Sequence, residues 1–264
     1  MRATAQVSEA ASQLSGHPLV LCTRVADLAP LAEALSRLAP AATAVSAQNG
    51  VDSDALLARF FRRAAGLVVR QTCTRFDDRS ARAAGRGRLI VGGHADAESL
   101  AALLERADYD VGLSRDLGSD RWLKLCLNLL SAPNALVVRQ DHASRDFVEA
   151  KARLLEEARD VLGAAGIRAA SCDGRDRSLD EEISSQRASL EQGTSARNLP
   201  LYNQVWSALR GGGSLEADAY HRSICELGRV HGVATPSNAR MLELLLLAAR
   251  EARGPESLRA AELL

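Results

Sequence analysis

The sequence RWLKLCLNLLSAPNAL, Arg121–Leu136, marks a change in the hydrophobic pattern of the chain. Its leucines recur at the spacing of an amphipathic helix, and from Asp120 onward Leu, Ala, Glu and Arg follow one another at 3.6-residue spacing. Lys124 and Asn128 stand one helical turn apart inside this leucine run. Because a buried ammonium group is costly unless it is paired, Lys124 either reaches solvent or faces a cleft.

Upstream of this stretch, short apolar runs alternate with helical segments. The runs at residues 17–24 and 41–50 flank a segment with leucines at helical spacing, which predicts a βαβ unit. Further elements are expected at 52–61 (helix), 64–76 and 85–93 (strands), 95–107 (helix) and 108–114 (strand). The sequence therefore predicts a small α/β N-terminal domain over residues 1–115 and an all-α C-terminal domain over residues 116–264.

Composition narrows the class of protein. A chain of 264 residues with 47% apolar content can bury a core, and its 33 basic and 33 acidic residues are interleaved, which argues against nucleic acid as a partner. Five scattered cysteines without a C-x-x-C pair argue against a disulfide framework and a metal site and favour the cytoplasm. No apolar run approaches the roughly 18 residues that cross a membrane. We expect a soluble protein with a small-molecule substrate.

Two further segments accompany the leucine-rich helix: GSLEADAYHRSICELGRVHGVATPSNARMLELL, residues 213–245, and SAQNGV, residues 46–51. Together the three stretches resemble the ketopantoate reductase (2-dehydropantoate 2-reductase) family. The first is similar to its helix W-x-K-L-x-x-N. The second is similar to (T/S)-x-E-x-D-x-x-N-G followed by H-G-(V/I)-x-x-P-x-N, and the third to the N-G turn after the fifth Rossmann strand.

This resemblance implies an oxidoreductase of pantothenate biosynthesis that uses NADPH to reduce a 2-oxo acid to a 2-hydroxy acid. It implies that the N-terminal α/β domain is a partial Rossmann-like domain and that the helical domain is like the C-terminal domain of 6-phosphogluconate dehydrogenase. The catalytic residues it implies are Lys124, as the acid, and Glu216, which would hold a substrate hydroxyl. Substrate-binding roles fall on Asn128, Asn49, Asn203, Asp218 and His221, and cofactor-binding roles on Arg24 and Asn49.

The residues alone leave other roles open. A lysine on an amphipathic helix is usually a solvated surface residue, and a Glu-x-Asp pair usually begins a helix. A histidine such as His221 on a helix is more often structural than an extra acid or base. His231 and Pro236 are expected to shape a turn, and Asn238 to cap the helix after it.

The chain also departs from the family pattern. It contains no G-x-G-x-x-G, the segment that lets a dinucleotide pyrophosphate approach a helix N-terminus, and the lysine of a family Thr-Lys pair is Arg24. We therefore expect an N-terminally truncated or divergent member. His221 and Arg222 replace an Asn-Gly pair, and Ala132 replaces an asparagine, so the preferred substrate is expected to differ from ketopantoate.

Three hypotheses follow. In the first, the protein is an NADPH-dependent 2-oxo acid reductase whose given sequence starts at an internal methionine. In the second, the cleft around Lys124 and Glu216 performs cofactor-independent acid/base chemistry, such as an isomerisation or a cyclisation. In the third, catalysis is lost and the protein is a binding or assembly module, with an exposed sheet edge and a homodimer formed through the helical domain.

Overall fold

The computed structural model describes residues 17–71, 73–75, 81–83, 87–93, 96–192, 203–211 and 215–264. The chain divides into two compact units, Met1–Arg121 (unit 1) and Trp122–Leu264 (unit 2). The boundary predicted from the sequence lies earlier, between residues 115 and 116. Unit 1 is built on a sheet and unit 2 on helices, so the predicted fold class is confirmed.

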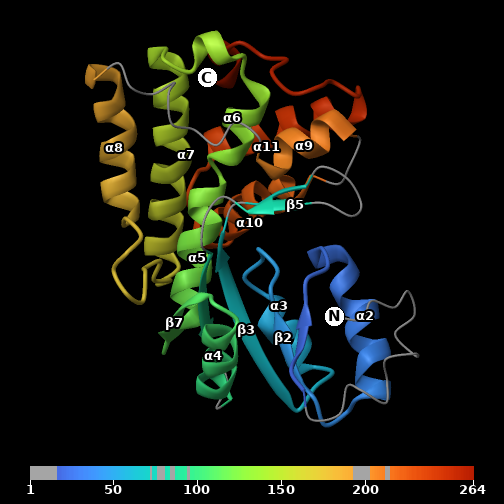
Figure 1. Cartoon of the computed structure of the whole chain (residues 1–264). Helices are drawn as coiled ribbons and strands as arrows, with labels where there is room; N and C mark the ends of the chain where they lie inside the picture. The colour runs from blue at the N-terminus through green and yellow to red at the C-terminus, as the bar shows by residue number, and fades with distance from the viewer. Residues whose placement is uncertain are drawn as a thin grey trace. The chain divides into compact units, whose positions relative to one another are not determined.

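Unit 1 contains a five-stranded sheet in the order β1-β2-β3-β6-β7 (Figure 1). Its strands are β1 (Leu19–Leu21), β2 (Thr43–Ser46), β3 (Arg63–Arg70), β6 (Arg88–Gly92) and β7 (Asp110–Ser114). Neighbouring strands are parallel except β3 and β6, which are antiparallel. The single strand predicted at 64–76 is in fact two, because the chain leaves the sheet after β3 and β4 (Cys73–Arg75) pairs with β5 (Ala81–Ala83) in a separate sheet.

Helices cover both faces of the main sheet. On one face, α2 (Val25–Leu38) and α3 (Ser53–Ala58) bury their apolar side chains against Ala44 of β2. On the other face, α4 (Ala97–Arg106) packs against Val45, the next residue of the same strand. Successive side chains of a strand point to opposite faces, so the small-residue run of β2 serves two cores at once.

In the leucine-rich stretch, the structure has two helices where the sequence predicted one. These are α5 (Leu117–Asn128) and α6 (Ser131–Leu136). The break has a local cause at Pro133, which has no backbone N–H and whose ring would collide with the carbonyl of Leu129 in a continuous helix. The break leaves Asn128 at the end of α5.

Unit 2 is organised around α7 (Arg145–Ala164). This helix packs against α8 (Leu179–Gln192), α10 (Glu216–His231), α11 (Pro236–Arg250) and the 3-10 helix η3 (Ala260–Leu263), and α9 (Gln204–Gly211) packs against α6. α8 is rich in polar residues and carries three acidic side chains in its first turn, Asp180, Glu181 and Glu182. Arg187 on α8 pairs with Glu156 on α7 at 2.7 Å.

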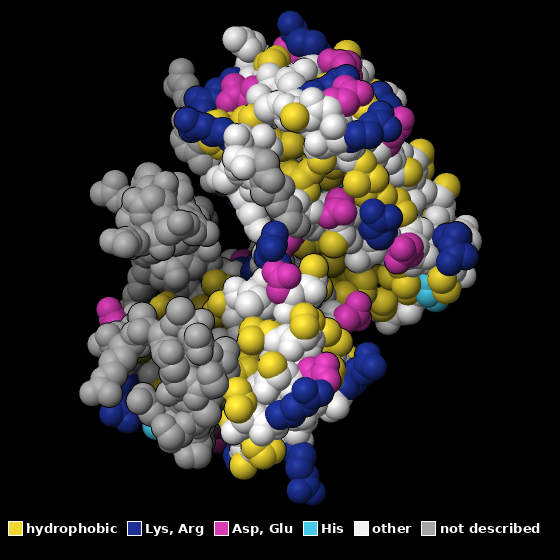
Figure 2. Space-filling view, turned by 90° about the vertical axis from the view of Figure 1, so that its right-hand side faces the viewer, with side chains coloured by type: hydrophobic (Ala, Val, Ile, Leu, Met, Phe, Trp, Pro, Cys, Tyr) yellow, Lys and Arg dark blue, Asp and Glu magenta, His cyan; other side chains and the backbone are white. Residues whose placement is uncertain are grey.

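The surface carries both signs of charge. On the face shown in Figure 2, Lys and Arg side chains are interspersed with Asp and Glu side chains. Among the helices that the structure describes, none combines the length and the apolar character needed to cross a membrane.

Candidate functional site

In unit 1, the loops that follow β1 and β2 lie side by side, because these parallel strands end at the same edge of the sheet. Gln48 joins the loops, since its Nε2 donates hydrogen bonds to the carbonyl oxygens of Leu21 at 2.7 Å and Thr23 at 3.1 Å. Asn49 follows and is half-buried. Gln48 Oε1 and Thr23 Oγ1 are buried without a hydrogen-bond partner within the described ranges. Unsatisfied polar atoms at the carboxyl edge of an α/β sheet indicate a ligand-binding position.

Arg24 lies beside this edge, directly before α2. Its Nε donates to Asp27 Oδ2 at 3.1 Å, and about half of each side chain is exposed. An exposed ion pair between residues three apart is weak, so the guanidinium can exchange its partner for an anionic ligand. The cofactor contact assigned to Arg24 stays a prediction.

In unit 2, Lys124 and Asn128 lie on one face of α5, because residues four apart on a helix are neighbours. Both are half-buried. Of the 33 basic residues only Lys124 and Lys151 are lysines, and the others are arginines. A lysine can give up a proton, whereas arginine stays charged. The residue type at position 124 therefore suits an acid.

A chain of hydrogen bonds connects Asn128 with Asn203. Ser131 Oγ donates to the carbonyl oxygen of Asn128 at 2.5 Å, and Asn203 Nδ2 donates to the carbonyl oxygen of Ser131 at 2.8 Å. Asn203 Oδ1 accepts the backbone N–H of Trp206 at 2.9 Å and so caps the start of α9. The end of α5, the start of α6 and the start of α9 therefore meet at these residues.

Glu216 begins α10 and faces the start of α9. Gln204 Nε2 donates to Glu216 Oε2 at 2.8 Å, and the Tyr220 hydroxyl lies 3.5 Å from the same oxygen. Because Gln204 directly follows Asn203, hydrogen bonds link the start of α10 to the start of α9 and, through Ser131, to the backbone carbonyl of Asn128. The positive end of the α10 dipole also favours a carboxylate at this position.

Asp218 and His221, which were also predicted to bind substrate, each have another partner in unit 2. Asp218 faces Arg222 on the same helix, 3.7 Å away, and both side chains are partly exposed. His221 is fully buried, and its Nδ1 lies 2.8 Å from Asn238 Oδ1. Burial lowers the pKa of His221 from 6.5 to about 4, although its hydrogen bond to Asn238 opposes this shift. This geometry favours the structural alternative for His221.

The helix cap expected from Asn238 is supplied by another residue. Glu157 on α7 accepts the backbone N–H groups of Ser237 and Asn238 at 2.7 and 2.9 Å, while Asn238 Nδ2 donates to the same carboxylate at 2.8 Å. These backbone groups have no partner inside α11, because they belong to its first turn. Asn238 is thus a buried link between His221 and Glu157.

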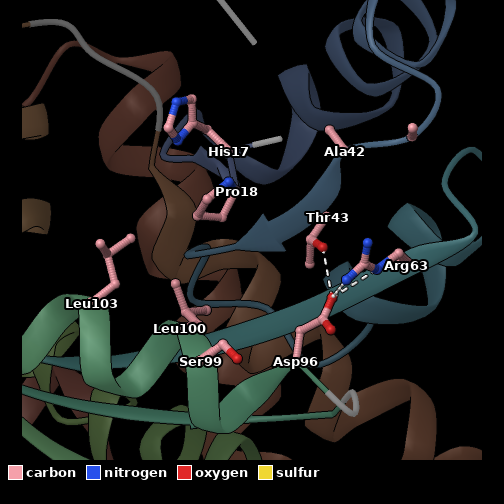
Figure 3. A pocket seen from close by; sticks show the side chains of 10 residues that line it. His17, Pro18, Ala42, Thr43, Arg63, Asp96, Ser99, Leu100 and Leu103 are labelled. Carbon is pink, nitrogen blue, oxygen red and sulfur yellow. Dashed lines mark hydrogen bonds and ion pairs between the residues drawn. The ribbon is translucent and has the colours of Figure 1, made fainter. Parts of the chain in front are cut away.

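In the described part of the chain, a cavity lies away from these residues, and no metal centre is found. A cavity of about 310 Å³ opens at the amino ends of β2 and β3 (Figure 3). Inside it, Asp96 accepts hydrogen bonds from Thr43 Oγ1 and Arg63 Nε, both at 2.8 Å. No predicted site residue lines it. Within the described ranges, no group of three His, Cys, Asp or Glu side chains is arranged to hold a metal ion.

Sequence analysis assigned no role to Arg121, whose buried side chain reaches the turn that holds Asn49. The hydrogen-bond partners of Arg121 are about seventy positions away in the sequence, so its neighbours along the chain do not reveal them. A charged residue at the start of a leucine-rich helix was the one signal available. Sequence analysis likewise assigned no role to Gln204 and Tyr220, whose side chains lie beside Glu216.

A mostly parallel sheet covered by helices and followed by a helical unit defines the class as Rossmann-like with a helical second domain. The family model described as "Ketopantoate reductase PanE/ApbA C terminal" matches residues 116–249, about half of the chain. The protein therefore belongs to the ketopantoate reductase family.

Curated relatives agree with this assignment. The chain is 31% identical over 152 residues to the 2-dehydropantoate 2-reductase of Caulobacter vibrioides, a match that covers 58% of this chain and 49% of the relative. It is 25% identical over 242 residues to that of Halobacterium salinarum, covering 88% of this chain and 76% of the relative. The first match spans about half the length of that relative.

Solved structures share the fold. A PanE/ApbA family ketopantoate reductase from Ralstonia eutropha JMP134 has a TM-score of 0.74 at 22% identity, covering 92% of this chain and 79% of that chain. D-mandelate dehydrogenase in complex with NADH has a TM-score of 0.72 at 15% identity, covering 89% and 80%. A dimeric ketopantoate reductase from Staphylococcus aureus has a TM-score of 0.71 at 16% identity, covering 90% and 79%. At these identities the likeness shows the fold alone.

Proposed function

We propose that the protein is an oxidoreductase that reduces the carbonyl group of a 2-oxo acid to a hydroxyl group with hydride from NADPH. The observation that carries the proposal is the series of hydrogen bonds in unit 2 that links the backbone of Asn128, one helical turn from Lys124, to Asn203 and, through Gln204, to Glu216. Family membership supports the same reaction.

Lys124 is the proposed acid. When hydride reaches the carbonyl carbon, negative charge develops on the carbonyl oxygen. The Lys124 ammonium group would stabilise that charge and donate the proton, and one well-placed donor is worth about 3 to 4 kcal/mol in such a site. Its half-buried position strengthens this interaction, because the local dielectric constant is lower than that of water.

Glu216 and the asparagines are the proposed positioning groups. The Glu216 carboxylate accepts from Gln204, and a carboxylate is also a suitable acceptor for a substrate hydroxyl. Asn128 and Asn49 would bind the substrate by neutral hydrogen bonds. Asp218 and Asn203 are also proposed to bind substrate. Asp218 lies in the first turn of α10, and Asn203 caps the start of α9.

A nicotinamide nucleotide, when bound, supplies the hydride. The edge that follows β1 and β2 fits its nicotinamide end, because the unsatisfied Gln48 Oε1 suits a carboxamide donor and Thr23 Oγ1 can donate or accept. Arg24 is proposed to bind a phosphate group of the same cofactor. As a separate point, we propose that the protein forms a homodimer, as described for the Staphylococcus aureus structure. Sedimentation velocity of the purified chain tests this proposal, because it distinguishes a dimer from a monomer by mass.

The test is a steady-state assay of the purified chain with NADPH or NADH and a panel of 2-oxo acids that includes ketopantoate. Lys124→Met should lower kcat/KM by about 10²- to 10⁴-fold, the range for loss of a general acid. Lys151→Met is the matched control, because it removes the only other lysine, and it should leave kcat/KM within about twofold.

The outcomes separate the reductase from a cofactor-independent enzyme. Reduction that depends on Lys124 supports the reductase. No nucleotide oxidation with any 2-oxo acid, together with no NADPH binding by calorimetry, refutes it. In that case, turnover of a substrate without nucleotide that Lys124→Met abolishes would favour an isomerase or cyclase.

A further inference from the structure

Arg121, at the start of α5 in unit 1, is one of the most densely hydrogen-bonded side chains in the described part of the chain. Only 2% of it is exposed. Its Nε and Nη2 donate to the two oxygens of Asp54 at 2.8 and 2.7 Å, a two-pronged pairing. Nη2 also donates to Ser46 Oγ at 2.6 Å. Ser46 Oγ in turn donates to Asp54, so the three polar groups close a ring.

The remaining nitrogen of Arg121 binds the turn that holds Asn49. Nη1 donates to the carbonyl oxygen of Gln48 at 3.0 Å and to that of Gly50 at 3.1 Å. These carbonyl groups belong to the residues on either side of Asn49. One guanidinium group therefore fixes the backbone before and after the asparagine, while the Gln48 side chain fastens the same turn to the end of β1.

The neighbouring strand leaves room for this arrangement. Gly66 of β3 packs directly against it, and a Cβ atom there would lie 2.5 Å from Asp54 Oδ1 and 2.7 Å from Arg121 Nη2. Burying a guanidinium group together with its polar partners costs free energy, because each group loses its contacts with water. Much of this apparatus converges on one three-residue turn, Gln48–Gly50.

We propose that Arg121 is a positioning residue, which holds the backbone on both sides of Asn49 and thereby sets the direction in which the Asn49 amide meets the substrate. The inference rests on the proposed reductase function, because it assumes that Asn49 contacts the reacting molecules. Arg121 itself contacts neither the substrate nor the cofactor in this proposal. A lysine at this position keeps the charge but loses the planar fork that reaches Asp54 and two carbonyl groups together.

The test measures two properties of Arg121→Lys: hydrogen exchange of the amides at residues 47–50, and steady-state kinetics. Exchange in the turn should accelerate about tenfold, because two carbonyl anchors are lost. In an active enzyme, kcat should fall about 10- to 100-fold while KM changes less than about threefold, since misplaced groups harm mainly the transition state.

Arg63→Lys is the matched control. Arg63 also pairs with an aspartate, Asp96, but it is half-exposed and lies at the amino ends of the strands (Figure 3), so this variant should change neither property. If Arg121→Lys does not fold, Asp54→Asn weakens the same clamp and should give the same pattern at smaller size.

Unchanged exchange at 47–50 overturns the inference, whether or not the enzyme is active. Faster exchange with unchanged kcat in an active enzyme overturns the positioning role. A wild-type chain without any nucleotide-dependent activity refutes the proposed function and the positioning role with it, while exchange still decides whether Arg121 holds the turn.

Discussion

Gly66→Ala should destabilise unit 1. The added Cβ would lie 2.5 Å from both Asp54 Oδ1 and Leu117 Cδ2, and 2.7 Å from Arg121 Nη2. None of these atoms can retreat freely, because Asp54 and Arg121 hold each other and Arg121 is almost fully buried. Overpacking of this kind costs about 1 to 3 kcal/mol, and the lost backbone freedom of glycine offsets about 0.5 to 1 kcal/mol of it. Two contacts at 2.5 Å and one at 2.7 Å place the overpacking cost in the upper half of its range, so the expected net loss is about 1 to 2 kcal/mol.

Differential scanning calorimetry measures this loss. For a unit of this size, about 1 kcal/mol corresponds to about 4 °C, so the transition of unit 1 should move down by about 4 to 8 °C. Gly163→Ala is the matched control, because a Cβ there meets nothing within 4 Å and the residue is helical. That variant should gain about 0.5 to 1 kcal/mol. A Gly66→Ala protein as stable as the wild type would refute the argument.

Two buried ionisable groups give pH-dependent predictions. Because burial lowers the pKa of His221 from 6.5 to about 4, the unfolded state binds the proton first, and stability should fall by about 3 kcal/mol as pH drops from about 6.5 to 4. His221→Leu should remove most of this decrease when the free energy of unfolding is measured by urea denaturation at each pH. An equal decrease in both proteins would contradict the lowered pKa of His221. Burial lowers the pKa of Lys151 from 10.5 to about 8, against the attraction of Glu182, so Lys151→Met should be more stable at pH 7 by about 1 to 3 kcal/mol. This advantage should shrink between pH 8 and 10.5, where the wild type gains stability, and a variant that is less stable at pH 7 would show that the ammonium group is well compensated.

Local patterns predicted the fold class but not the path of the sheet. Apolar runs separated by helical segments predict alternating strands and helices, and the loss of that alternation after Asp120 predicts the helical unit. The reversal between β3 and β6 depends on a separate β4–β5 hairpin, and no periodicity in 64–76 reports where the chain leaves the sheet. The break between α5 and α6 was readable in principle, since Pro133 stands inside the run.

The candidate site divides in the same way. Helical spacing places Lys124 and Asn128 together, and the family resemblance points to Glu216. The hydrogen bond from Gln204 to Glu216 and the contacts of Arg121 join residues that are far apart in the sequence, where one chain offers no covariation to detect them. His221 could not be placed from the sequence, because its position in the motif allowed either a substrate contact or a structural role, and only the packing shows that it is buried.

The contact between Glu157 and the start of α11 also bears on the order of folding. The carboxylate and the amides it accepts are 80 and 81 positions apart in the sequence. At a synthesis rate of about 5 to 20 residues per second, α7 emerges about 4 to 16 seconds before the helix whose first turn it completes. During that interval the nascent chain must keep α7 soluble without its later partner, so this is the window in which a chaperone would have most to protect.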